Sequence, residues 1–201
     1  MIKPYAGVSS ENWSKKTEEL IRKHPLNTTE IVEIILQSWE EIFKSSFGSK
    51  KFKIGKDIFP KPQIMGFILE ELVALEISKR HSKIWKQSKE VFEKDLVCIK
   101  DSQFSIEMKV SSSKRDIFGN RSYAQKITKK PAKKSKDGYY LAINFEKFDK
   151  SSTNKLPKIT LIRFGWLDHA DWTGQKEPSG QNARLSKEVK QHKLITLYPK
   201  I

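Results

Sequence analysis

Cysteine is almost absent from this sequence, because Cys98 is the only one in 201 residues. A single cysteine cannot form an intrachain disulfide, which is typical of proteins from a reducing cytoplasm. The four histidines are scattered and lack the spacing of zinc ligands, so we expect no zinc site. No apolar run approaches roughly 18 residues, and residues 1–5 lack the apolar core of a signal peptide. We therefore predict a cytoplasmic protein with no membrane partner.

Acidic residues are too few to balance the basic ones. The chain contains 39 Lys and Arg residues against 24 Asp and Glu residues, a formal net charge of +15. This excess favours polyanionic partners, and without a membrane segment we expect nucleic acid to be the partner. Five Trp, eleven Phe and five Tyr residues argue against disorder. A chain of this length is sufficient for one domain with a sizeable core.

The beginning of the chain is predicted to be helical. One helix ends before Pro25, and a second begins at residues 27–30, where Asn-Thr-Thr-Glu resembles a capping box. Apolar residues of the second helix recur at helical spacing up to Gly48. We interpret residues 1–59 as a helical segment packed on a core formed by residues 60–201.

A third helix should begin at Pro60-Lys61-Pro62, because proline suits the first turn of a helix. The helix is largely apolar, but Glu70 and Glu71 interrupt it. A carboxylate close to the buried face of a helix is costly unless it is paired. Two interpretations remain open: a glutamate at the exposed edge of the apolar stripe, or a carboxylate that reaches toward a cation held by the next part of the chain.

An acidic residue, Asp95, begins a stretch with the pattern of a β-hairpin. The apolar residues after it are followed by a polar turn, residues 100–103, and by residues 104–111, in which apolar and polar side chains alternate. Successive side chains of a strand point to opposite faces, so Glu107 and Lys109 share a face. If Asp95 lies opposite residue 107 or 109, its carboxylate joins them, whereas a one-residue slip sends it to the other face.

These three side chains indicate a particular chemistry. Two carboxylates a few ångströms apart bind a hard cation such as Mg²⁺, so we predict Asp95 and Glu107 as metal ligands. A neighbouring lysine, Lys109, can orient or deprotonate a water molecule that attacks a phosphate. The pattern therefore favours a nuclease site. The alternative is a solvated strand face on which Glu107 and Lys109 form ion pairs, since this spacing arises by chance in lysine-rich proteins.

The segment after this hairpin is strongly basic. Residues 109–136 contain ten Lys or Arg residues and one acidic residue, a net charge of +9. They form either a solvated basic loop or, over residues 110–136, a loop laid along DNA phosphates. Arg pairs well with guanine, and Asn or Gln with adenine, so some of these side chains are candidates for base contacts. The predicted DNA-binding residues are Ser111, Ser112, Ser113, Lys114, Arg115, Asn120, Arg121, Ser122, Tyr123 and Gln125.

The rest of the chain is predicted to complete a sheet. Residues 139–145 and 159–164 have the pattern of neighbouring strands, and residues 194–198 that of a last strand. Residues 183–191 are predicted to form a short helix. Residues 168–171 contain two Asp and one His but have no nearby nucleophile, so we interpret them as a structural turn or a loop that contacts DNA.

This order of a helix, an acid-led strand, a Glu-x-Lys strand and further strands resembles the PD-(D/E)XK nuclease superfamily. The proline of the motif is absent, since Glu93-Lys94 precede the acid. Residues 66–73 look like the Gly-x-x-x-Glu pattern of the superfamily, which favours Glu70 over Glu71. The resemblance implies an α/β (α+β) fold with a mixed central sheet flanked by helices. It also implies a catalytic set formed by Glu70, Asp95, Glu107 and Lys109.

Within this superfamily the sequence resembles the ScaI-type family of Type II restriction endonucleases. Residues 107–111, 118–124 and 162–169 carry the resemblance together with Gly180-Gln181, and it covers roughly residues 60–198. It implies Mg²⁺-dependent hydrolysis of double-stranded DNA at a short palindromic site by a homodimer in a bacterial or archaeal cytoplasm. It also suggests blunt ends. The alternatives are a structure-specific or repair nuclease of the same fold and a basic nucleic-acid-binding protein without catalysis.

Overall fold

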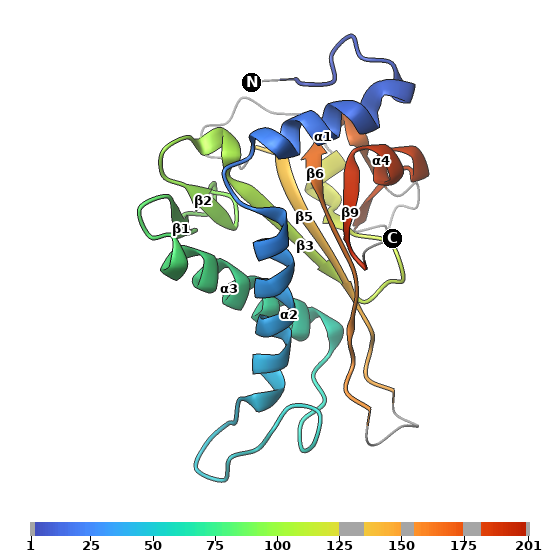
Figure 1. The fold of residues 1–201 in the computed structure, drawn as a ribbon. Helices are drawn as coiled ribbons and strands as arrows, with labels where there is room; N and C mark the ends of the chain where they lie inside the picture. Colours follow the sequence, from blue (N-terminus) through green and yellow to red (C-terminus); the bar gives the residue numbers. More distant parts are fainter. Residues whose placement is uncertain (1–2, 125–134, 150–154, 175–181, 200–201) are drawn as a thin grey trace.

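The computed structural model describes residues 3–124, 135–149, 155–174 and 182–199. Its centre is a six-stranded sheet in the order β1-β2-β3-β5-β6-β9 (Figure 1). Strands β3 and β5 are parallel and the other neighbours are antiparallel, so the sheet is mixed, as predicted. The strands are β1 Trp85–Gln87, β2 Leu96–Cys98, β3 Ile106–Ser111, β5 Gly138–Phe145, β6 Ile159–Leu167 and β9 Leu194–Tyr198.

Three helices pack on one face of this sheet. They are α1 Trp13–Lys23, α2 Thr28–Lys44 and α3 Pro62–Arg80. Helix α3 lies against β1 and β3, α2 against α3 and β9, and α1 crosses β6 and β9 (Figure 1). Their apolar side chains join those of alternate strand residues in one buried cluster, because successive strand residues face opposite sides. No helix in the described residues is long and apolar enough to cross a bilayer.

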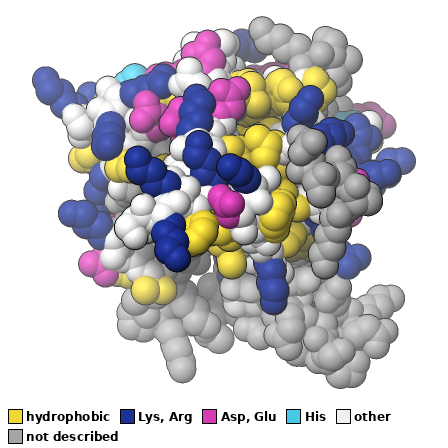
Figure 2. All heavy atoms as spheres, turned by 90° about the horizontal axis from the view of Figure 1, so that it is seen from below, with side chains coloured by type: hydrophobic (Ala, Val, Ile, Leu, Met, Phe, Trp, Pro, Cys, Tyr) yellow, Lys and Arg dark blue, Asp and Glu magenta, His cyan; other side chains and the backbone are white. Residues whose placement is uncertain are grey.

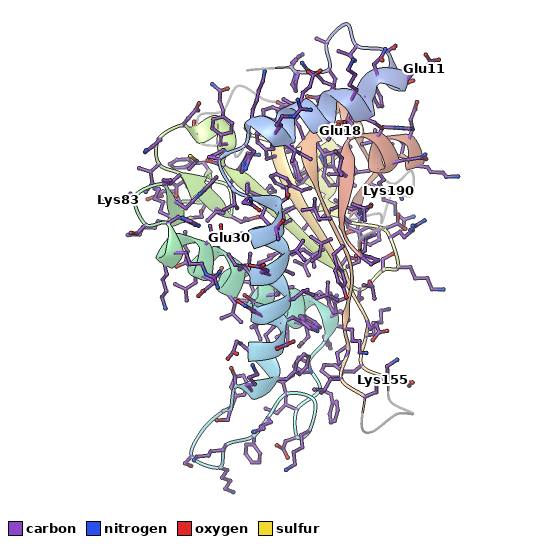
Figure 3. The ribbon with its side chains drawn as sticks, in the orientation of Figure 1. Glu11, Glu18, Glu30, Lys83, Lys155 and Lys190 are labelled. Atoms are coloured by element: carbon purple, nitrogen blue, oxygen red, sulfur yellow. The ribbon has the colours of Figure 1, made fainter. Side chains whose placement is uncertain are left out.

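The helix ends are fixed largely as predicted. Asn27 caps α2, because its side chain accepts hydrogen bonds from the backbone N–H groups of Thr29 and Glu30 at 2.8 and 3.3 Å. The Glu30 carboxylate lies 3.0 Å from His81 Nε2 and so connects α2 with the end of α3 (Figure 3). Pro62 occupies the first turn of α3, where the missing N–H costs little.

A second, three-stranded sheet covers the other face of the main sheet. Its order is β4-β8-β7, with β4 Gly119–Asn120, β7 Trp172–Gly174 and β8 Asn182–Leu185. It encloses a second apolar cluster with Tyr140 and Ala142 of β5 and Val189 of helix α4, Lys187–His192. The prediction of a helix over residues 183–191 is therefore wrong for its first part. In β8, Ala183 and Leu185 are buried while the residues between and before them are exposed, so pairing with β4 and β7 decides the structure.

The predicted hairpin is present with a longer connection. Strands β2 and β3 are antiparallel, and the 3-10 helix η2 Ser102–Phe104 lies in the turn between them. The only Cα pair assigned to the two strands is Leu96 with Ile106. Strand β3 therefore extends well beyond β2, and the far half of its edge on this side has no strand beside it in the described chain.

The connection between α2 and α3 projects from the lower end of the molecule (Figure 1). Seen from below, this end shows Lys and Arg side chains beside hydrophobic ones (Figure 2). The large apolar side chains exposed in this connection are Phe47, Phe52, Ile58 and Phe59, and Ile64 and Phe67 are exposed near the start of α3.

Candidate active site

The polar face of β3 is buried and charged. Ile106 and Met108 enter the apolar core, while Glu107 and Lys109 point to the opposite face, as the alternation predicts. The Glu107 side chain is 3% exposed and that of Lys109 17% exposed, and Lys109 Nζ donates to Glu107 Oε1 at 2.5 Å. Such burial of two charges requires that each be compensated, and here they compensate one another.

Asp95 lies directly before β2, and its side chain contacts the same strand, β3. It directly precedes Leu96, whose pairing with Ile106 places Asp95 opposite Glu107 when the register is extended by one pair. Asp95 Oδ2 accepts a hydrogen bond from the backbone N–H of Met108 at 2.7 Å. Of the two registers that the sequence allowed, this is the one that brings the carboxylate to Glu107 and Lys109.

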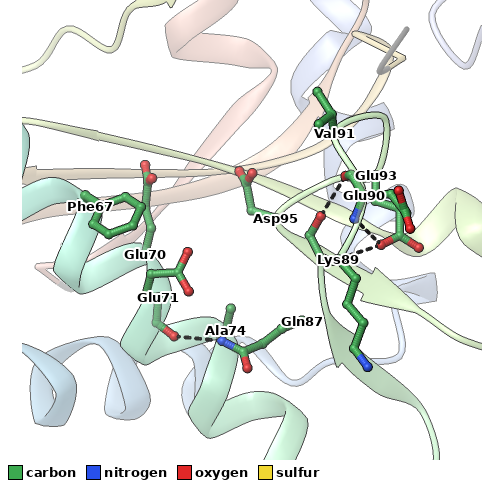
Figure 4. A pocket seen from close by; sticks show the side chains of 11 residues that line it. Phe67, Glu70, Glu71, Ala74, Gln87, Lys89, Glu90, Val91, Glu93 and Asp95 are labelled. Atoms are coloured by element: carbon green, nitrogen blue, oxygen red, sulfur yellow. Dashed lines mark hydrogen bonds between the residues drawn. The ribbon is translucent and has the colours of Figure 1, made fainter. Parts of the chain in front are cut away.

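Glu70 reaches β3 from α3. Its carboxylate accepts a hydrogen bond from the Val110 backbone N–H, and it lies in the electrostatic field of Lys109, Asp95 and Glu107. Asp95 and Glu70 therefore bind two N–H groups, those of Met108 and Val110, along the edge of β3 that β2 leaves open. In Figure 4 the carboxylates of Glu70 and Asp95 point to the same side, whereas Glu71 lies lower in the neighbouring pocket.

A pocket of about 340 Å³ opens beside these carboxylates (Figure 4). It lies between α3 and the segment that leads from β1 to β2, and five of its lining residues are acidic. The acidic lining includes Glu70 and Asp95 themselves, so the pocket and the carboxylate pair form one continuous site. A pocket with this lining favours cations over anions unless a cation is already bound.

The pKa values of Glu70 and Lys109 are both shifted by burial and by the neighbouring charges. Burial raises the pKa of Glu70 to about 7, and the Asp95 and Glu107 charges act in the same direction against Lys109. Burial opposes the charged form of Lys109, but Glu107, Asp95 and Glu70 outweigh it and raise the pKa of this lysine. In the metal-free site Lys109 is therefore a cation and a hydrogen-bond donor.

The raised pKa of Glu70 should make the stability of the metal-free protein depend on pH. Because the pKa is about 7 in the folded protein and 4.5 ordinarily, the folded state binds this proton more tightly. The resulting stabilisation is fully present below pH 4.5 and is lost as the pH rises through about 7. We expect calorimetry in EDTA to give a Tm that falls over this range, and Glu70→Gln to flatten the fall. Parallel curves for the two proteins would contradict this.

The ligand chemistry of the site fits a hard divalent cation. Asp95, Glu107 and Glu70 offer only carboxylate oxygens, the donors that Mg²⁺ prefers. Within the described part of the chain, no three acidic, His or Cys side chains are already gathered as a ligand set. Glu107 Oε1 instead accepts from Lys109 and from the Tyr123 hydroxyl. A cation held by these carboxylates would bind the other oxygen of Glu107, while Oε1 keeps its two donors.

Tyr123 was predicted as a DNA-binding residue, and the structure places it inside the protein. It is 8% exposed, and its hydroxyl donates to Glu107 Oε1 at 2.6 Å. Sequence reasoning missed this contact because 16 residues separate the two side chains and no local pattern links them. Its neighbours Asn120 and Ser122 are exposed, and the Ser122 hydroxyl donates to Asn120 Oδ1 at 2.6 Å.

Two buried polar residues, Asn144 and Arg163, form hydrogen bonds with the backbone of the loop that follows β3. Asn144 Nδ2 donates to the carbonyl oxygens of Ser113 and Asp116, each at 2.9 Å. Arg163 Nη2 donates to the Arg115 carbonyl oxygen at 2.7 Å and to Asn144 Oδ1 at 3.0 Å. Sequence reasoning missed both residues, although a polar residue inside each of two apolar strands was a usable signal.

The predicted DNA-binding residues therefore differ in their surroundings. Lys114 and Arg115 are exposed, and Asp116 beside them pairs with Lys190 of α4 (Figure 3). Ser111 at the end of β3 is half-buried, as are Ser112 and Ser113 in the loop that Asn144 and Arg163 hold. The side chain of Arg121, Gln125 and residues 126–134 lie outside the described residues.

The acidic residues near position 170 are structural, the first of the two interpretations given above. Lys193, 2% exposed, donates to Asp168 at 3.0 Å and to Asp171 at 2.8 Å. Its ammonium also lies 4.1 Å from the centre of the Tyr5 ring and 4.4 Å from that of Trp13. These contacts join α1, the segment after β6 and the start of β9.

The mixed central sheet flanked by helices, with carboxylates and a lysine at the open edge of β3, is the arrangement that the resemblance to the PD-(D/E)XK nuclease class implies. Comparison with known proteins narrows this class. The family model of the ScaI restriction endonuclease matches residues 3–198. The Type II restriction enzyme ScaI of Streptomyces caespitosus is 45% identical over 195 residues, which cover 97% of this chain and 84% of that protein.

The chain belongs to the ScaI restriction endonuclease family and is a Type II restriction endonuclease. The predicted family is confirmed. The resemblance covers more of the chain than the predicted residues 60–198, however, because the family model also matches the helical segment before residue 60. Helices α1 and α2 thus belong to the family's own sequence rather than to an unrelated addition.

Proposed function

We propose that the chain hydrolyses phosphodiester bonds of double-stranded DNA with Mg²⁺ at a site formed by Glu70, Asp95, Glu107 and Lys109. The observation that carries this proposal is the convergence of the four side chains on the open edge of β3. They come from helix α3, from the residue before β2 and from β3, yet they share hydrogen bonds or electrostatic contacts with one another or with adjacent backbone. Surface ion pairs on a solvated strand would not be buried to this degree.

Each of these residues has a proposed role. Asp95 and Glu107 would hold the cation, and Glu70 would support it from α3 once its carboxyl group is ionised. Lys109, held as an ammonium by its neighbours, would orient the attacking water and stabilise negative charge on the phosphate. When bound, Mg²⁺ supplies Lewis-acid stabilisation of charge on the phosphate and leaving oxygens. Hydrolysis joins the water oxygen to phosphorus and breaks the bond to the leaving sugar oxygen, which takes up a proton.

We infer that the loop after β3 and the β4–η3 segment, residues 119–124, bind the DNA. Lys114 and Arg115 are exposed on a loop that begins directly after the catalytic strand, so they are suited to phosphate contacts close to the scissile bond. Asn120 is exposed, and its side-chain amide is suited to adenine. The net positive charge of the chain would add a non-specific attraction for DNA.

Phosphate and base contacts should respond differently to substitution. We expect Lys114→Ala to weaken binding equally at all sequences and to lower the slope of log affinity against log salt by about one. Asn120→Ala should instead reduce the preference for the recognition site and leave non-specific affinity nearly unchanged. Gel retardation at several salt concentrations, on a cognate and an altered duplex, measures both. An equal loss on both duplexes for Asn120→Ala would make it a phosphate contact.

We further propose that a homodimer cuts both strands of a short palindromic site in the bacterial cytoplasm. The two-fold symmetry of a palindrome is matched by two copies of one chain, each of which brings one site to one strand. The bacterial relative supports the cellular setting.

Digestion of phage and plasmid DNA tests the proposed function. We expect discrete fragments in Mg²⁺ and intact DNA in EDTA. Sequencing of the fragment ends would then give the recognition site and the cut position. A smear would indicate a non-specific nuclease, and cleavage restricted to branched DNA would indicate a structure-specific one. Unchanged but retarded DNA would contradict catalysis.

A further inference from the structure

Tyr123 makes a contact that its position in a basic segment does not suggest. Its hydroxyl donates to Glu107 Oε1 at 2.6 Å, and Lys109 Nζ donates to the same oxygen at 2.5 Å. Hydrogen bonds to a charged acceptor are among the stronger ones in proteins. Two such donors on one oxygen restrict the rotation of this carboxylate.

The ring of Tyr123 belongs to the small sheet rather than to β3. It packs edge-to-face on Trp172 of β7, with ring centres 4.9 Å apart and an interplanar angle of 65°. The side chain also packs closely on Gly119 of β4, where an added Cβ would lie only 2.7 Å from Tyr123 Cγ. The ring is therefore in contact with two strands of the sheet that also presents Asn120.

We propose that Tyr123 is a positioning residue that transmits the placement of the β4–η3 segment to the metal-binding carboxylate of Glu107. The proposal rests on the proposed role of Glu107 as a metal ligand. The same short segment presents Asn120 and Ser122 to solvent and Tyr123 to the site. When this segment moves on binding DNA, the Tyr123 hydroxyl moves with it and displaces the Glu107 carboxylate. The affinity of the site for the cation therefore depends on the position of the segment.

Tyr123→Phe tests this role because it removes the hydroxyl and keeps the contacts of the ring with Gly119 and Trp172. We expect the concentration of Mn²⁺ that half-saturates the protein–DNA complex, measured by calorimetry, to rise by about tenfold. The Mg²⁺ concentration for half-maximal cleavage should rise by a similar factor. Affinity for DNA in EDTA should change by less than about twofold. Unchanged metal affinity would overturn the proposal, whatever the effect on stability.

Gly119→Ala tests the transmission from the sheet. The added methyl group must push the Tyr123 ring, so we expect weaker Mn²⁺ binding when residue 123 is tyrosine. In the Tyr123→Gly background, which also removes the Cβ that would lie 2.9 Å from the added methyl group, this group has room, and Gly119→Ala should then cause no further loss. Such non-additivity is expected only if the two residues act through one contact. Equal losses in the two backgrounds would overturn transmission through Tyr123.

Tyr5→Phe is the matched control. Tyr5 is also buried, and its hydroxyl lies 2.7 Å from Thr17 Oγ1 in the helical layer on the other face of the main sheet. Its loss should lower stability without moving the Mn²⁺ titration. If wild type and Tyr123→Phe bind the ion equally, this inference fails and the proposed function stands. If Asp95→Asn and Glu107→Gln bind it like wild type, the proposed function fails as well.

Discussion

Lys109→Ala should lower the rate of DNA cleavage by about a thousandfold and leave DNA binding intact. Lys109 Nζ lies 2.5 Å from Glu107 Oε1, and its raised pKa keeps the ammonium charged among three carboxylates. Removal takes away the cation proposed to orient water and to stabilise the phosphate. The rate is measured under single-turnover conditions in Mg²⁺, and the affinity for the same duplex by gel retardation in EDTA.

The matched control is Lys83→Ala, because Lys83 is exposed in the connection after α3 (Figure 3). It removes the same charge and should leave the rate unchanged. Asp95→Asn and Glu107→Gln should behave like Lys109→Ala, since each removes a proposed metal ligand. Full cleavage by any one of these three variants would remove that residue from the site.

Lys193→Ala should destabilise the protein by about 3–5 kcal/mol. The ammonium is 2% exposed and donates to Asp168 and Asp171, so its loss leaves two largely buried carboxylates without their cation. It also removes the cation from the faces of Tyr5 and Trp13. Urea unfolding followed by tryptophan fluorescence gives the difference in free energy of unfolding.

Two comparisons distinguish the loss of a buried cation from the mere loss of lysine side-chain atoms. Lys44 forms ion pairs on the surface of α2, and Lys44→Ala should have little effect on the unfolding midpoint. In the Asp171→Asn background one of the carboxylates is already neutral, so the loss caused by Lys193→Ala should be smaller. An equal loss in both backgrounds would show that the pairing with Asp171 contributes nothing.

Local pattern was enough to predict the strand that carries Glu107 and Lys109. Its alternation requires one face to be apolar, and once Ile106 and Met108 enter the core the two charged residues must share the other face. The choice between Glu70 and Glu71 came from the family resemblance, because helical periodicity placed either one at the edge of the apolar stripe. The structure gives Glu70 the contact with Val110.

Contacts between distant segments were beyond the reach of the sequence. The small sheet joins residues from three separate parts of the chain, and its strands are too short to carry a periodic pattern. Tyr123 consequently looked like a DNA contact, although burial against Trp172 turns its hydroxyl to Glu107. Asn144 and Arg163 were missed for the same reason, since their partners are carbonyl groups of a loop about 30 or more residues away in sequence.

Direct measurement of metal binding tests the central claim most directly. Mn²⁺ is titrated into wild type and into the Asp95→Asn/Glu107→Gln double variant, each bound to the recognition duplex, and binding is followed by calorimetry. We expect wild type to bind the ion with an affinity that the double variant loses by at least about a hundredfold. Equal binding by the two proteins would place the metal elsewhere and contradict a site at the open edge of β3.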